Sequence, residues 1–167
     1  MTHIDIKLEP LTREAFKPFG DVIELNESND MFPINFGLTE RHHALSRVDV
    51  ADGGGEPIIS LFENQPASLP IRVKVMERHP LGSQAFIAIS GNPYVIVVGE
   101  AGDFDHTKLH AFLAQSSQAI NYYKGTWHHY CLGLNAVNQF VVVDRGGTGD
   151  NCDESEIPDD VVITVNH

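Results

Sequence analysis

The sequence predicts a mainly β protein, a sandwich or closed barrel of short strands, in a single domain that spans residues 1–167. Three observations predict this fold class. Apolar residues alternate with polar ones at a period of two in several segments, Gly and Pro interrupt these segments at short intervals, and few stretches show helical spacing. A parallel α/β fold would need longer helical patterns between its strands. The length of 167 residues suits one domain with an apolar core.

Strands account for most of the predicted elements. Ile4, Ile6 and Leu8 alternate with polar neighbours and predict the first strand. Alternation or runs of β-branched residues predict later strands at residues 71–79, 84–88, 140–143 and 161–165.

Two segments predict short helices. Residues 12–19 have Thr12 as the first residue of a helix that ends near Pro18. Residues 105–115 have Asp105 as a possible N-cap and an apolar face of Leu109, Phe112 and Leu113.

The charge balance excludes some partners. Eleven Lys and Arg against 23 Asp and Glu give a net charge of −12, which disfavours nucleic acid because phosphate binding needs a basic face. A small anionic substrate then needs local Arg or His. The longest apolar run, near residues 94–98, is too short for a membrane helix, and the first residues do not resemble a signal peptide. Two cysteines form no disulfide framework, so we expect a cytoplasmic protein.

One predicted strand and the return strand after it bring polar side chains together. If residues 71–79 form one regular strand, Glu77 and His79 share the face of Val73 and Val75. The turn at residues 80–82 then places Gln84 opposite them. We therefore expect these three polar groups to converge at the end of an apolar strand pair, as ligand pockets commonly do.

A second segment adds imidazoles. Residues 121–129 contain an aromatic-rich strand, a turn at Gly125, and the adjacent His128 and His129, of which only one can face the pocket. Together with Glu77, His79 and Gln84, this predicts either a divalent-metal site or an acid–base cluster. The residues alone leave both interpretations open.

The spacing of these residues resembles the two motifs of the cupin superfamily. Glu77 stands at the position of the first His, His79 matches the second, and Gln84 replaces the motif's Glu. The matches to the glycines and to the last His are Gly91, Gly125 and His128. The resemblance implies a cupin-like double-stranded β-helix, a jelly-roll barrel with one or two short helices.

Longer strings resemble the ureidoglycolate lyase family, also called ureidoglycolate hydrolase. They occur in the same order, at residues 34–43, 77–86, 125–129, 144–147 and 150–153. The resemblance implies a homodimer of allantoin (purine) catabolism that cleaves (S)-ureidoglycolate to glyoxylate and urea. It also implies a divalent metal, nickel, and no organic cofactor.

The reaction needs a base for the hydroxyl proton, an acid for the departing urea nitrogen and a cation for the substrate carboxylate. We expect His79 and His128 as acid and base, with Glu77 as an alternative base or as a residue that orients a His. With a metal bound, the ligands would be Glu77, His79, Gln84 and His128.

Arginine matches a carboxylate with two parallel hydrogen bonds. Arg145, directly after the strand at residues 140–143, and Arg41, in a segment with Asn35, are the candidates for the substrate carboxylate, and Gln84 is a further substrate contact. Two alternatives remain, namely a hydrolase that releases ammonia and a non-enzymatic cupin that binds a small anion.

Overall fold

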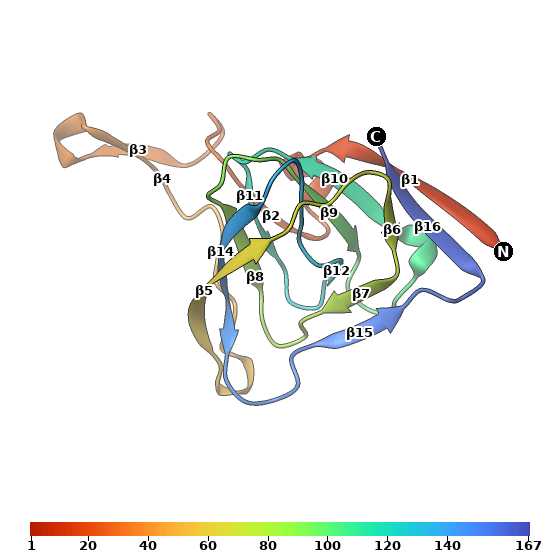
Figure 1. The fold of residues 1–167 in the computed structure, drawn as a ribbon. Helices are drawn as coiled ribbons and strands as arrows, with labels where there is room; N and C mark the ends of the chain where they lie inside the picture. Colours follow the sequence, from red (N-terminus) through yellow and green to blue (C-terminus); the bar gives the residue numbers. More distant parts are fainter.

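The computed structural model describes all residues, 1–167, and confirms the mainly β prediction. Two separate curved sheets face each other and together form an open barrel (Figure 1). The larger sheet has the order β15-β7-β12-β9-β10-β1-β16-β6, with β13 also paired to β9. Its strands are β1 (Thr2–Pro10), β6 (Ile71–Val73), β7 (Val75–Arg78), β9 (Tyr94–Gly99), β10 (His110–Ala114), β12 (Trp127–His128), β13 (Leu132–Gly133), β15 (Asp153–Glu156) and β16 (Val161–Asn166).

The second sheet has five strands in the order β2-β11-β8-β14-β5. They are β2 (Gly20–Ile23), β5 (Glu56–Asn64), β8 (Gln84–Ala88), β11 (Ala119–Tyr122) and β14 (Asn138–Gly146). A separate hairpin of β3 (Met31–Ile34) and β4 (Thr39–His42), joined by the 3₁₀ turn η1 (Asn35–Gly37), projects from the barrel (Figure 1). We call residues 31–42 the arm.

The core consists of two apolar clusters, one on each face of the larger sheet. Tyr94, Ile96 and Val98 of β9 face the barrel interior, whereas Val95 and Val97 face the second cluster. Because β9 is buried on both faces, its sequence is a continuous apolar run rather than an alternating one. No helix of the structure has the length and apolar composition needed to cross a membrane.

The first predicted helix is confirmed and the second is wrong. The Thr12 hydroxyl accepts a hydrogen bond from the Ala15 N–H at 3.2 Å and starts α1 (Arg13–Phe16), whose Phe16 is fully buried. Asp105 does cap a turn, but this is the three-residue η3 (His106–Lys108), and the chain continues as strand β10. Residues of β10 pack into both apolar clusters, and burial on both faces imitates helical spacing.

The strand predicted at residues 71–79 is interrupted. Lys74 separates β6, which pairs with β16, from β7, which pairs with β12 and β15. The single regular strand is therefore a wrong prediction, because the chain leaves one group of strands for another at Lys74. The remaining 3₁₀ turn is η2 (Asp52–Gly54).

Candidate active site

The side chains of Glu77, His79 and His128 form one cluster on β7 and β12. The register pairs Glu77 directly with His128, and His79 follows the end of β7. One possible ligand atom from each of the three residues lies within 4.8 Å of the others. The sequence-based expectation that Glu77, His79 and His128 converge therefore agrees with the geometry.

The orientation of His128 leaves one ring nitrogen free. Its Nδ1 lies 3.1 Å from the backbone oxygen of His129 and 3.9 Å from a carboxylate oxygen of Glu77. Its Nε2 is buried and has no hydrogen-bond partner. Burial, followed by the nearby His79, lowers the pKa of His128 to about 3. A neutral ring that donates from Nδ1 to the carbonyl keeps its lone pair on Nε2.

His79 repeats this arrangement. Its Nδ1 lies 2.7 Å from the backbone oxygen of Asn151, and its Nε2 is likewise buried without a partner. Because a carbonyl oxygen only accepts hydrogen bonds, Nδ1 carries a proton and donates it, so the lone pair of the neutral tautomer lies on Nε2. Metal-binding histidines are typically oriented by such a bond on their second nitrogen. The donor set therefore fits a divalent metal ion.

Gln84 belongs to the facing sheet and contacts a different carboxylate. Its Nε2 donates to Asp144 Oδ2 at 3.0 Å, while its Oε1 is buried and unpartnered. Gln84 pairs in register with Tyr122, whose ring stacks on His128 at a centroid distance of 4.3 Å and an interplanar angle of 6°. Gln84 is thus linked to the cluster through Tyr122.

Sequence reasoning missed Tyr122, Asp144 and Asn151. The Tyr122 ring is buried and stacked on His128. Burial raises the pKa of Tyr122 well above its usual value, which keeps the phenol a neutral donor. The inward alternation of Phe140 and Val142 could have indicated that Asp144 also faces inward.

The cluster lies on strands of the barrel wall. Five surface hollows, with volumes of 410 to 540 Å³, are lined by other residues. Asn151 joins its own loop to the segment that follows His79, because its Oδ1 also accepts a hydrogen bond from the Leu81 N–H at 2.8 Å. The site therefore combines buried, partner-free donor atoms with a loop that holds one of them in place.

Comparison with known proteins identifies the family. The family model described as ureidoglycolate lyase matches residues 3–164. The chain belongs to the ureidoglycolate lyase family. Its activity class is therefore that of a lyase acting on ureidoglycolate, as the sequence predicts.

Several curated ureidoglycolate lyases are similar over nearly their whole length. The protein of Burkholderia mallei (strain NCTC 10229) is 50% identical over 159 residues, which are 95% of this chain and 93% of that protein. That of Burkholderia cepacia is 53% identical over 150 residues, 89% and 84% of the two chains. A solved dTDP sugar isomerase from Desulfovibrio desulfuricans G20 has a TM-score of 0.48 and 16% identity, covering 86% and 87% of the two chains.

Arg145, expected to hold the carboxylate of ureidoglycolate, is buried and hydrogen-bonded to backbone oxygens. Its Nε donates to Asp52 at 3.0 Å, and its Nη2 donates to Thr148 at 2.8 Å and to Gly53 at 3.5 Å. No carboxylate lies within ion-pair distance, and only Nη1 has no hydrogen bond. Arg145 thus joins two loops and has one nitrogen left for a ligand.

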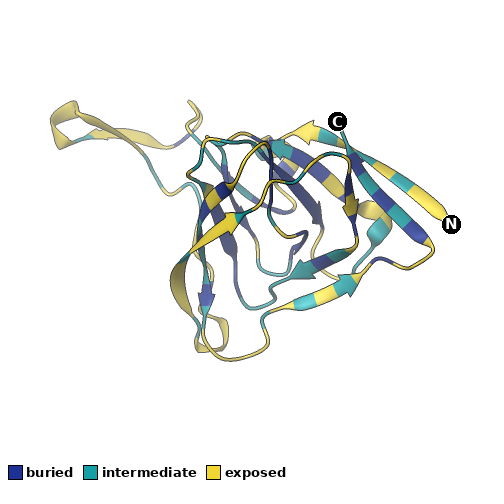
Figure 2. Cartoon of the chain, in the orientation of Figure 1, coloured by how far each residue is buried: buried dark blue, intermediate teal, exposed yellow.

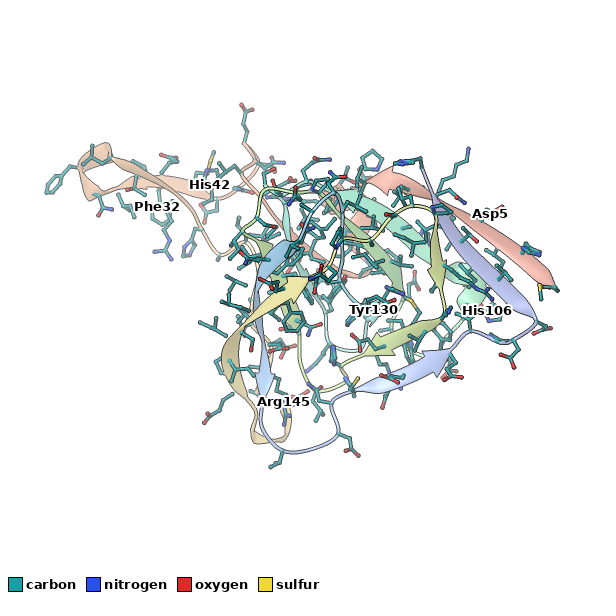
Figure 3. All side chains as sticks on the ribbon, in the orientation of Figure 1. Asp5, Phe32, His42, His106, Tyr130 and Arg145 are labelled. Carbon is teal, nitrogen blue, oxygen red and sulfur yellow. The ribbon has the colours of Figure 1, made fainter.

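Arg41 and Asn35, also expected to bind ureidoglycolate, are not near the cluster in this chain. Both belong to the arm, which extends away from the barrel, as Phe32 and His42 show in Figure 3. Arg41 lies over the Phe32 ring at 6.0 Å, and Asn35 Nδ2 donates to Thr39 Oγ1 at 3.2 Å. One chain therefore does not bring these two residues to its own Glu77, His79 and His128.

Proposed function

We propose that this chain cleaves (S)-ureidoglycolate to glyoxylate and urea at the cluster of Glu77, His79 and His128. The observation that carries this proposal is the pair of buried, partner-free Nε2 atoms on His79 and His128 beside a carboxylate. The substrate is a hemiaminal, so cleavage moves one proton from its hydroxyl to the urea nitrogen as the carbon–nitrogen bond breaks. No water molecule is consumed.

Glu77 is suited to move this proton. Its carboxylate takes the hydroxyl proton as the aldehyde carbonyl forms and returns it to the departing nitrogen. The Tyr122 phenol, stacked on His128, donates a hydrogen bond to the ureido oxygen, where negative charge grows as the bond breaks.

The ligands of a divalent ion, nickel by family resemblance, would be His79, His128, Glu77 and Gln84. Such an ion would polarise the substrate's hydroxyl and carboxylate oxygens and lower the pKa of the hydroxyl. The two Nδ1–H groups, each bonded to a backbone oxygen, hold the imidazoles with Nε2 free for this role. Cys131 and Cys152 are both free thiols, which supports a cytoplasmic location, and we also propose a homodimer.

A product balance tests the reaction. Purified protein with (S)-ureidoglycolate is expected to release glyoxylate and urea in equal amounts, faster than the spontaneous decay of the hemiaminal measured without protein. Ammonia in place of urea would instead support the hydrolase, and no turnover above the spontaneous rate would support an anion-binding cupin.

Metal binding can be measured independently of turnover. Chelator-treated protein titrated with Ni²⁺ in a calorimeter is expected to bind one ion per chain, with affinity at least about 100-fold weaker in His79→Ala, because a direct ligand contributes no less than the groups that orient it. His3→Ala, on an exposed part of β1, is the matched control and should bind as the unmodified protein does. Unchanged affinity in His79→Ala would contradict the assigned ligand set.

The role of Tyr122 is tested by removing only its hydroxyl. Tyr122→Phe is expected to lower kcat/KM by about 100- to 1,000-fold, because one donor to a developing negative charge is lost. Tyr123→Phe is the control, since the Tyr123 hydroxyl instead donates to Asp21 at 2.8 Å. Equal kinetics of the two variants would show that the Tyr122 phenol does not touch the substrate.

A further inference from the structure

The outer face of β8, β14 and β5 is apolar and bare. The register aligns Leu61, Val141 and Ile87 in one row across the three strands and Ile59 beside Val143 in the next. Leu61 is 73% exposed and Ile59 is 76% exposed, and β5 is also the edge strand of its sheet (Figure 2). An exposed, flat, hydrophobic edge is a surface that native proteins normally cover.

The chain itself covers the other half of the same face. Residues 44–51 lie over β2 and β11, where the Ser46 hydroxyl donates to Asp21 at 2.7 Å and Asn121 Nδ2 donates to the backbone oxygen of Arg47 at 2.8 Å. Residues 44–51 make no hydrogen bond to β14 or β5, and within these two strands the turn that follows them bonds only to Arg145, near the end of β14. None of these five aligned outward side chains is charged, so two copies that each carry −12 meet no like charge across these two rows. The next row of the face carries Glu63, whose carboxylate accepts a hydrogen bond from Gln139 Nε2 at 3.0 Å.

The apolar face of β5, β14 and β8 is too small to hold a stable dimer without further contacts. β5 and β14 have nine residues each and β8 has five. At about 3.3 Å per residue and about 4.8 Å between strands they cover roughly 370 Å², below the roughly 800 Å² that each partner of a stable complex buries. The arm can supply the remainder, because Phe36 and Leu38 at its tip are almost fully exposed. A dimer that uses the sheet face and the arm together reaches the required size.

The site also lacks an arginine whose guanidinium is free to make two parallel hydrogen bonds with the substrate carboxylate. Arg78 is held by Asp153 at 2.8 Å and lies over the Trp127 ring at 4.7 Å, and Arg145 has only Nη1 left. Arg41 has no carboxylate partner and lies on the projecting arm. The arm leaves the barrel near one end of the five-stranded sheet, whereas β7 and β12 lie toward the opposite end (Figure 1).

We propose that two copies of this chain pack through the bare face of β5, β14 and β8 in antiparallel orientation, and that the arm of each copy brings Arg41 to the site of the other. A two-fold axis perpendicular to the strands exchanges the two ends of the sheet, so each arm reaches the end where its partner's cluster lies. Arg41 then binds the carboxylate of ureidoglycolate, and Asn35 at the arm's turn provides a further polar contact. This inference rests on the proposed function for the identity of the bound anion.

Subunit complementation tests the shared site. Arg41→Ala and His128→Gln chains, each expected to be almost inactive alone, are unfolded together and refolded, or co-expressed. Half of the dimers then contain one chain of each kind. Each such dimer has one intact site out of two, so the mixture regains about a quarter of the normal rate per chain. Mixed dimers seen by native mass spectrometry without regained activity would overturn the inference.

A charge on the sheet face tests the interface. Leu61→Glu is expected to convert the dimer to a monomer in analytical ultracentrifugation and to lose turnover while it still binds Ni²⁺, whereas the exposed Leu25→Glu outside the face remains dimeric and active. A Leu61→Glu dimer, or an unmodified protein that is monomeric, would contradict the proposed face. Failure of the proposed reaction would look different, as an inactive but dimeric unmodified protein.

Discussion

His79→Ala and His128→Ala are each expected to reduce turnover of ureidoglycolate by at least about two orders of magnitude, the range of a lost acid–base or metal-binding group. Each substitution removes one of the two buried Nε2 atoms that have no partner within the protein. Steady-state kinetics with a coupled assay for glyoxylate measures the effect. Near-normal rates in both variants would place the reaction centre elsewhere.

The His128 variant needs a structural control, because the ring is buried and stacks on Tyr122. His128→Gln keeps much of the side-chain volume and is expected to lose activity to a similar degree while retaining its near-ultraviolet circular dichroism. His3→Ala should retain both the spectrum and the rate. Loss of the native spectrum in His128→Gln together with its activity would show a packing role instead.

Arg145→Ala is expected to destabilise the fold by about 3 kcal/mol, because hydrogen bonds from a charged group each contribute about 1.5–3 kcal/mol and buried carbonyl oxygens lose their donor. For a chain of this size, the melting temperature should fall by roughly 6–12 °C. Urea unfolding monitored by fluorescence measures the change. The donor atoms Nε and Nη2 connect the loop at Asp52 and Gly53 to the loop at Thr148, so both loops lose an anchor.

The exposed Arg72→Ala provides the comparison for Arg145, with an expected change within about 0.5 kcal/mol. Kinetics of Arg145→Lys then separates the two roles considered for this residue. A raised KM with unchanged stability would restore Arg145 as the principal ligand of the substrate carboxylate. Reduced stability with an unchanged KM supports its role as the connection between the loops.

Part of the strand pattern was predictable, and its two wrong predictions have separate causes in the tertiary structure. Alternation predicted β1, and runs of β-branched residues predicted β14 and β16, because both patterns are local properties of the sequence. The segment that contains β10 was misassigned as a helix because both faces of that strand are buried, which removes the alternation. The break at Lys74 was not visible because it depends on which strands β6 and β7 pair with.

The sequence by itself determined the family, the β fold class and the residues of the central cluster, because motif spacing and strand period are properties of neighbouring residues. Only the tertiary structure decided how each side chain uses its hydrogen-bonding groups. The guanidinium of Arg145 meets the backbone of Asp52 from 93 positions away, and the imidazole of His79 meets that of Asn151 from 72 positions away. Such contacts depend on how distant segments pack together, and local spacing carries no information about them.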